Sequence, residues 1–274
     1  MLHKRLVFAK RFVLHSNIVE YKQKVFKFEE KNEMTEVLFN GHAGRLEGRY
    51  HQSTNPNAPI ALILHPHPQY GGTMNNKVVY TLFSCFQSLN FSVLRFNFRG
   101  VGRSQGTFED GVGELADATI ALDWLQAQNP EARQCWIAGY SFGAWIGLQL
   151  LMRRPDINNF VAVSPPANEN DFSFLAPCPT SGLVVQGGKD EIVTPSSVAS
   201  LAKSLNAQRS VQVDFALIED GDHMYNNHLV DLYKIIGNYV VNVVKKKAPQ
   251  KKRRGRRKKI EMEGNTPLLT GDKD

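Results

Sequence analysis

Cysteine is scarce in this chain of 274 residues and forms no recognisable pattern. The three cysteines, Cys85, Cys135 and Cys178, are odd in number and lack a C-x-x-C spacing, which argues against a disulfide framework or a zinc site. Long apolar runs are also missing, since no stretch approaches the ~20 residues of a membrane-spanning helix. Lys10 and Arg11 interrupt the apolar start of the chain, and no small-residue cleavage site follows. These absences lead us to expect a cytoplasmic protein.

Positive charge is concentrated in one place. The chain has 33 Lys and Arg against 26 Asp and Glu, but 11 of the basic residues and no acidic ones lie between Lys245 and Lys259. Such a run would bind nucleic acid or an anionic surface weakly through charge, act as a nuclear address in a eukaryotic cell, or only keep a disordered end soluble. No aromatic residue interleaves with it, so base stacking is not indicated.

From about residue 35 the chain alternates short apolar runs with longer helical patterns. This alternation predicts an α/β fold around a mostly parallel sheet. Strands are expected at Ile60–Leu64, Phe91–Phe96, Cys135–Ala138, Phe160–Ser164, Leu183–Gln186 and Val211–Ile218, after an antiparallel hairpin of Thr35–Phe39 and Arg45–His51 that turns at Asn40-Gly41. Helices are expected at 74–89, 109–128, 142–153, 195–205 and 226–245.

Three segments follow from these patterns. Residues 34–245 are expected to form one folded domain, which is long enough for a single buried core. Residues 1–33 show no clean periodicity, so we interpret them as a dispensable extension, with Met34 as an alternative start. Residues 246–274 are polar and charged and are predicted to be a disordered tail.

The most informative motif is Gly139-Tyr140-Ser141-Phe142-Gly143, which matches G-x-S-x-G. It lies where an apolar strand pattern changes to a helical one, the context in which this motif exposes a serine nucleophile on a sharp turn. The two glycines are expected there because side chains at these positions would collide with the neighbouring backbone. We therefore predict Ser141 as the nucleophile.

A serine nucleophile needs a histidine to accept its proton and a carboxylate to orient that histidine. Asp190 and His223 each follow directly after a predicted strand, and they come after Ser141 in the order acid, then histidine. We predict them as the acid and the base. Glu191, Asp220 and Asp222 are weaker alternatives for the acid.

An oxyanion hole needs two fixed donors. The first is predicted to be the backbone N–H of Phe142, the residue after the nucleophile. The second should come from the loop that starts at His65, where Pro66 and Pro68 have no N–H. We predict His67 N–H as this donor, with Gln69 and Tyr70 as alternatives.

The substrate pocket is less well indicated. Only 18 residues separate the strands at 160–164 and 183–186, too few for a cap domain, so we expect an open, shallow acyl pocket. Arg99 either holds its loop or meets an anionic substrate, and the sequence leaves both open. The G-x-G at 100–102 lacks the rest of a dinucleotide fingerprint. Candidates for the pocket are Tyr70, Met74, Tyr140, Phe142, Phe172 and Phe174.

Four stretches carry a family resemblance, namely LHPHPQYGGTMNNKVV, LRFNFRGVGRSQGTFEDGVGELAD, AGYSFGAWIG and the surroundings of Asp190 and His223. Across residues 34–245 the chain resembles the lidless, uncharacterised branch of the α/β-hydrolase superfamily, similar to dienelactone hydrolase-like and small peptidase-like members. The resemblance implies an eight-stranded, mostly parallel sheet, a triad of Ser141, Asp190 and His223, and ester-type chemistry. A dienelactone hydrolase proper uses a cysteine nucleophile, and this chain departs from it there.

Taken together, the motifs predict a serine hydrolase that cleaves a small ester, thioester or related acyl compound through an acyl-enzyme, with no metal or organic cofactor. A peptidase or an acyltransferase on the same fold is the alternative among enzymes, because a triad fixes the nucleophile and leaves the acceptor open. A non-catalytic scaffold that recruits partners through the basic tail is the alternative from another class.

Overall fold

The computed structural model describes residues 34–209 and 211–247. The expected N-terminal extension and the tail after Lys247, with most of its basic run, lie outside the described residues. Among the described residues, no helix is long and apolar enough to cross a membrane.

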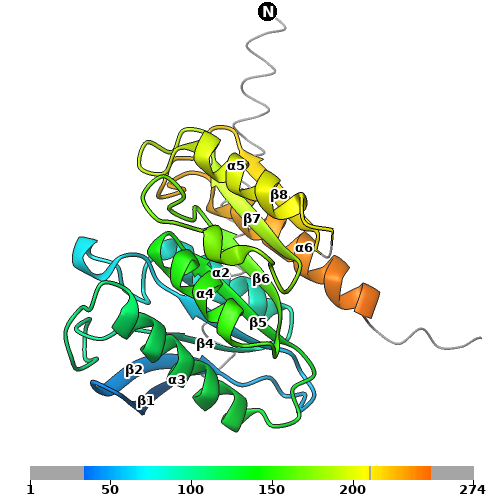
Figure 1. The fold of residues 1–274 in the computed structure, drawn as a ribbon. Helices are drawn as coiled ribbons and strands as arrows, with labels where there is room; N and C mark the ends of the chain where they lie inside the picture. The colour runs from blue at the N-terminus through cyan, green and yellow to red at the C-terminus, as the bar shows by residue number, and fades with distance from the viewer. Residues whose placement is uncertain (1–33, 210, 248–274) are drawn as a thin grey trace, which may run out of the picture.

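The described chain is built on one eight-stranded sheet (Figure 1). Its strand order is β1-β2-β4-β3-β5-β6-β7-β8, with antiparallel pairing of β1 with β2 and of β2 with β4, and parallel pairing everywhere else. The eight-stranded, mostly parallel sheet is therefore confirmed. The strands are β1 (Thr35–Gly41), β2 (Gly44–His51), β3 (Ile60–Leu64), β4 (Ser92–Phe96), β5 (Cys135–Tyr140), β6 (Ile157–Val163), β7 (Gly182–Gly187) and β8 (Val213–Ile218).

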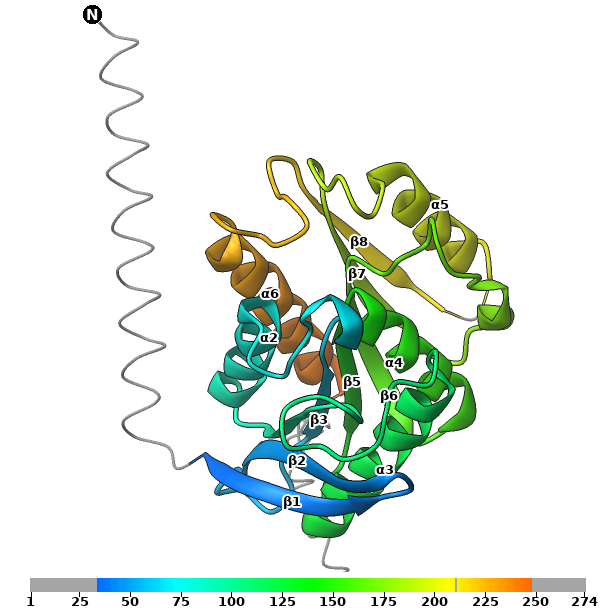
Figure 2. The ribbon, with the colours of Figure 1, turned by 90° about the vertical axis from the view of Figure 1, so that its left-hand side faces the viewer.

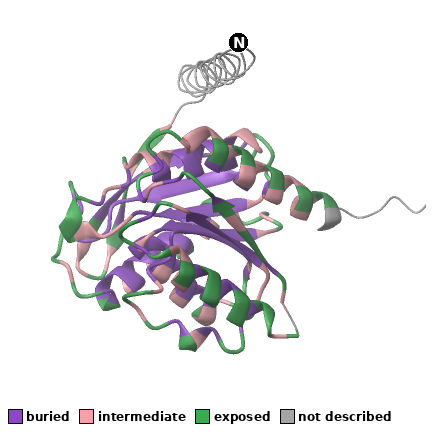
Figure 3. Cartoon of the chain, turned by 90° about the horizontal axis from the view of Figure 1, so that it is seen from above, coloured by how far each residue is buried: buried purple, intermediate pink, exposed green. Residues whose placement is uncertain are grey.

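Five α-helices cover the two faces of this sheet (Figure 2). They are α2 (Lys77–Ser88), α3 (Val112–Gln128), α4 (Phe142–Arg153), α5 (Pro195–Asn206) and α6 (Leu229–Lys247). Helices α2 and α6 pack on one face, and α3, α4 and α5 pack on the other, so two apolar cores flank the sheet. The central strands are buried from both sides (Figure 3), which explains why β3 to β7 are nearly continuous apolar runs.

Every strand and helix expected between residues 35 and 247 is present, with ends that differ by a few residues. The predicted hairpin turn is wrong: Asn40 and Gly41 still pair with Arg45 and Gly44, so the strands run further and the turn falls on residues 42–43. Two short 3-10 helices, at Pro68–Tyr70 and Ser173–Leu175, were not expected. Helix α6 begins at Leu229, so 226–228 belong to the preceding loop.

Parallel pairing brings the carboxyl ends of β3, β5, β6, β7 and β8 to one edge of the sheet. The connection between β6 and β7 is 18 residues long, 164–181, all of which the structure describes, and its only helix is the 3-10 helix Ser173–Leu175. The described chain inserts no cap domain at this point, so the carboxyl edge stays open for a site.

Candidate active site

Ser141 occupies a strained turn between β5 and α4. Its φ of 54° lies in the left-handed region that side chains other than glycine rarely adopt. A Cβ at Gly139 would collide with the backbone of Gly143, and a Cβ at Gly143 would collide with the carbonyl oxygens of Leu64 and His65. The two glycines therefore let the turn close tightly, as a strand-to-helix nucleophile elbow requires.

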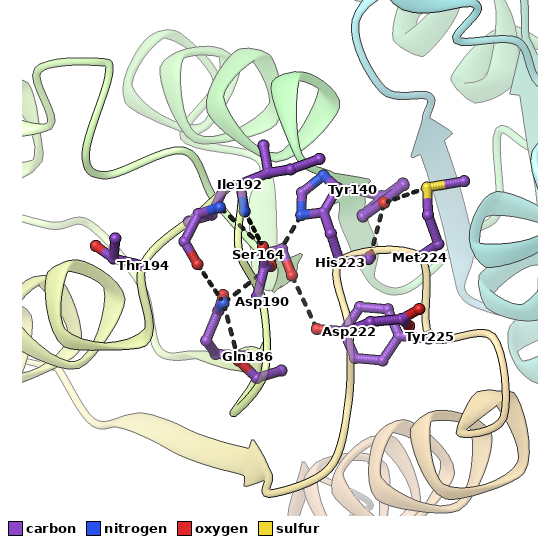
Figure 4. Close-up of polar contacts among 12 residues, drawn as sticks. Tyr140, Ser164, Gln186, Asp190, Ile192, Thr194, Asp222, His223, Met224 and Tyr225 are labelled. Carbon is purple, nitrogen blue, oxygen red and sulfur yellow. Dashed lines mark hydrogen bonds and ion pairs between the residues drawn. The ribbon is translucent and has the colours of Figure 1, made fainter.

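Asp190 and His223 meet at the same edge of the sheet. Asp190 lies in the loop after β7 and His223 in the loop after β8, and Asp190 Oδ2 lies 2.8 Å from His223 Nδ1. Figure 4 shows the imidazole with Asp190 on one side and Tyr140 on the other. Both side chains are largely buried, with exposed fractions of 5% for Asp190 and 9% for His223.

The Asp190 carboxylate is held by four donors. Its Oδ1 accepts from the backbone N–H groups of Ile192, at 3.0 Å, and Val193, at 2.8 Å. Its Oδ2 accepts from Gln186 Nε2 at 3.0 Å and also contacts His223 Nδ1 at 2.8 Å. Burial disfavours the charged form, but the hydrogen bonds from His223 and the backbone outweigh it and hold the pKa of Asp190 below its ordinary value. A carboxylate fixed in this way keeps the imidazole in one orientation.

Gln186, a wholly buried residue near the end of β7, supports Asp190 and was not predicted from the sequence. A glutamine inside an apolar strand was the available signal, because a buried amide has to find hydrogen-bond partners. The alternatives for the acid do not contact His223. Asp220 pairs with Lys189 at 2.7 Å, and Asp222 accepts from the backbone N–H of Asn226 at 2.9 Å.

Tyr140 ties the turn at Ser141 to the loop that carries His223. Its side chain is fully buried, and its hydroxyl donates to the carbonyl oxygen of His223 at 2.8 Å. The two rings lie 5.2 Å apart between centroids. Burial raises the pKa of Tyr140 above its usual range, so the phenol stays protonated and remains a donor.

A cavity of about 260 Å³ opens at this edge. Ser141, Tyr140 and His223 line it together with Phe142, His67 and Tyr70. Three of the expected pocket residues lie elsewhere. Met74 is buried at 2% exposure, with its N–H bonded to Asn97 Oδ1, and Phe172 and Phe174 stack on each other with centroids 5.9 Å apart. Their apolar character serves packing, and no sequence pattern separates packing residues from lining residues.

Two residues that line the cavity have backbone N–H groups without a partner among the described residues. Within residues 34–209 and 211–247, neither Phe142 N–H nor His67 N–H makes a hydrogen bond, and both residues line the cavity. Phe142 is the first residue of α4, where N–H groups have no partner inside the helix. The alternatives are occupied, since Gln69 N–H donates to His67 Nδ1 at 3.2 Å and Tyr70 N–H to the His67 carbonyl at 3.2 Å.

His65 fixes the loop that carries His67. It has no exposed surface, its Nδ1 lies 2.6 Å from the Pro66 carbonyl, and its Nε2 accepts from Phe98 N–H at 3.0 Å. These two contacts need a neutral ring with the proton on Nδ1. Burial lowers the pKa of His65 to about 4.

This buried histidine predicts a loss of stability in mild acid. Because the pKa of His65 is about 4 in the folded chain and about 6.5 in an unfolded one, the unfolded state takes up the proton first as the pH falls. The free energy of unfolding should therefore drop by about 3 kcal/mol between pH 6.5 and pH 4 from this group alone. Urea unfolding at a series of pH values measures the slope.

The matched variant is His65→Gln, whose amide oxygen can still accept from Phe98 N–H. It should be less stable at pH 7 but should lose this part of the pH dependence. If the variant and the wild type lose stability in parallel between pH 6.5 and pH 4, the assignment to His65 is wrong.

Arg99 holds a loop and does not reach the cavity. Its side chain is 4% exposed and makes a two-pronged contact with Asp117, through Nε at 3.0 Å and Nη2 at 2.7 Å, while Nη1 meets Glu109 at 2.7 Å. The structure therefore decides between the two roles that the sequence left open. Among the described residues, no group of three or more histidines, cysteines or acidic residues could hold a metal ion.

Comparisons with known proteins indicate the family of this chain. Residues 70–178 match a family model described as serine aminopeptidase, S33. An uncharacterised protein of Rickettsia prowazekii is 51% identical over 214 residues, which cover 77% of this chain and 90% of that protein.

Two solved structures are similar in sequence as well as in fold. A protein of unknown function from Agrobacterium tumefaciens, described as a putative alpha/beta hydrolase, is 50% identical with a TM-score of 0.76 and covers 78% of this chain and 98% of its own. A Xanthomonas campestris protein, described as a member of the a/b serine hydrolases without lid, is 31% identical with a TM-score of 0.69, over 77% and 95% of the two chains. The chain therefore belongs to the α/β-hydrolase superfamily, among its serine hydrolases without a lid.

Proposed function

We propose that this hydrolase cleaves small carboxylic esters through an acyl-enzyme, with Ser141 as nucleophile, His223 as general base and Asp190 as the carboxylate that orients His223. The observation that supports this most is the 2.8 Å contact of Asp190 with His223 Nδ1, made where His223 shares one cavity with the strained Ser141. With Nδ1–H donated to Asp190, the lone pair of the imidazole lies on Nε2. That nitrogen is the one free to take the serine proton.

The reaction then proceeds in two halves. Ser141 Oγ attacks the ester carbonyl while its proton passes to His223 Nε2, and the carbonyl oxygen becomes an oxyanion that Phe142 N–H and His67 N–H stabilise. Collapse of this intermediate breaks the ester bond, and His223 gives its proton to the leaving alcohol. Water, deprotonated by the same nitrogen, attacks the acyl-enzyme; the bond from Ser141 Oγ to the acyl carbon breaks, His223 returns the proton to Ser141 Oγ, and the acid is released. No step requires a cofactor.

The size of the cavity suggests short acyl chains. A volume of about 260 Å³ is small for a ligand site, and the described chain adds no cap over it. With p-nitrophenyl esters of increasing acyl length, we expect kcat/KM to be highest for acetate to butyrate and to fall as the chain grows. Highest kcat/KM for chains of twelve or more carbons would contradict the short-chain specificity, and failure to cleave any of the esters would contradict the esterase function.

Removal of the Tyr140 hydroxyl tests whether its contact positions His223. Tyr140→Phe should lower kcat about tenfold with little change in KM, because the carbonyl of His223 loses the donor that fixes its loop. The free energy of unfolding should fall by about 1 kcal/mol for the lost hydrogen bond. Steady-state kinetics and urea unfolding measure the two effects.

Tyr50→Phe is the matched control. It removes the hydrogen bonds between the Tyr50 hydroxyl and the side chain of Asn129, which lie outside the cavity, so it should cost similar stability and leave kcat unchanged. Equal kcat in Tyr140→Phe and Tyr50→Phe would show that the contact with His223 serves stability alone.

A further inference from the structure

In the part of the chain that the structure describes, the residues that line the cavity include a carboxylate and no lysine or arginine. Apart from two histidines and two tyrosines, Glu169 is the one ionisable residue among the described residues that line the cavity, and no lysine or arginine within 34–209 and 211–247 lines it. Arg99 was a candidate for binding an anionic substrate, but its guanidinium group forms ion pairs with Asp117 and Glu109. Among the described residues, the cavity lining therefore includes one carboxylate and no lysine or arginine.

The Glu169 carboxylate is free to meet a ligand. Its side chain is exposed and makes no hydrogen bond or ion pair with any residue between 34 and 247 that the structure describes. Its backbone is nevertheless held by a hydrogen bond, because Glu169 N–H donates to the Pro166 carbonyl at 3.1 Å. The preceding residue, Asn168, donates through Nδ2 to the Ile192 carbonyl at 3.0 Å. This hydrogen bond connects the loop after β6 to the loop after β7 that carries Asp190.

Aromatic rings line the same cavity as Glu169. Tyr70 lines the cavity with 86% of its surface exposed, and its ring centroid lies 4.6 Å from that of His67. Burial lowers the pKa of His67, although the negative charges of Glu114 and Glu169 oppose the shift. Because its pKa lies below the ordinary histidine value, the His67 ring favours the neutral form at pH 7 and does not neutralise Glu169.

A cavity lining that includes both a carboxylate and an exposed aromatic ring suits one chemical class of ligand. Ammonium groups are attracted both by a negative charge and by the face of an aromatic ring. We propose that the cavity favours esters that carry an ammonium group near the scissile bond, and that Glu169 determines this specificity. The inference rests on the esterase function proposed above and names its substrate class. Esters with a carboxylate or phosphate at that place are disfavoured.

The test compares esters that differ only in charge. Acetylcholine and 3,3-dimethylbutyl acetate have the same shape in the alcohol part, and p-nitrophenyl 4-(trimethylammonio)butyrate and p-nitrophenyl 5,5-dimethylhexanoate have the same shape in the acyl part. We expect the ratio of kcat/KM for cationic over neutral ester to fall about three- to fivefold in Glu169→Gln for at least one pair, the range of exposed charge pairs. In the wild type, the ratio should fall as salt is added.

Glu131→Gln is the matched control. It removes the same charge from an exposed site in the loop before β5, at the opposite edge of the sheet, and should leave both ratios unchanged. A binding measurement that needs no turnover accompanies the kinetics. Ligand-observed NMR on Ser141→Ala compares choline with 3,3-dimethylbutan-1-ol, and choline should bind more tightly until Glu169 is also replaced.

The outcomes separate the two proposals. If the neutral esters are cleaved and Glu169→Gln leaves every ratio unchanged, the ammonium specificity is wrong and the esterase function stands. If no ester is cleaved but choline binds Ser141→Ala in a manner that depends on Glu169, the ammonium site stands and the esterase function fails. Absence of any charge preference in both measurements overturns the ammonium site.

Discussion

Replacement of His223 by alanine should lower kcat for p-nitrophenyl acetate by roughly three to four orders of magnitude or more, the range found when a member of such a triad is removed. The reason is that a serine hydroxyl is a poor nucleophile unless a base takes its proton. KM should change little, because the base acts mainly in the transition state. Steady-state kinetics with active-site-titrated enzyme measure the loss.

His228→Ala is the control for this variant. His228 lies five residues further along, its Nδ1 is 3.0 Å from Asp231 Oδ2, and it does not line the cavity. Its replacement should leave kcat within about twofold of the wild type, as is usual for a surface substitution. Near-normal ester cleavage by His223→Ala would refute the assignment of the base.

Asp190→Asn should lower kcat by about three to four orders of magnitude while the fold persists. The asparagine can still accept from Ile192 and Val193 N–H through its oxygen, so its NH₂ group must then face His223. The imidazole would accept from that amide at Nδ1 and carry its proton on Nε2, the wrong nitrogen for a base. Kinetics and thermal unfolding separate the loss of activity from any loss of stability.

Glu191→Gln provides the comparison for Asp190→Asn. Glu191 is exposed and belongs to the same turn, but its carboxylate makes no contact with His223 among the described residues. Activity should be retained in Glu191→Gln. If the two variants lose activity to the same extent, the carboxylate of Asp190 has no special role and a general charge effect at this turn would explain both.

Much of the fold could be predicted because the buried sheet imposes a strong pattern. Strands covered on both faces need continuous apolar runs, and β3 was predicted with the ends that the structure has, Ile60 and Leu64. The hairpin turn was harder. Asn40-Gly41 is a strong turn signal, yet the cross-strand pair of Gly41 with Gly44 extends the ladder beyond it.

The candidate site was predictable where chemistry restricts residue type. Ser141, Asp190 and His223 each follow a strand, and parallel strands bring those ends together. Lining residues could not be predicted in the same way. Met74 and Tyr70 lie in the same loop region, but one is buried and the other exposed, because side-chain direction depends on packing between distant segments. Glu169 was missed for the same reason.

The most direct test of the account is covalent labelling of the wild-type chain with a fluorophosphonate probe, followed by mass mapping of the modified peptide. Such probes react with a serine only where a neighbouring base activates it. We expect one adduct, on Ser141, that Ser141→Ala abolishes and His223→Ala strongly slows. An unlabelled wild type, or a label that maps to another serine and survives Ser141→Ala, would contradict the proposal that Ser141 is the nucleophile.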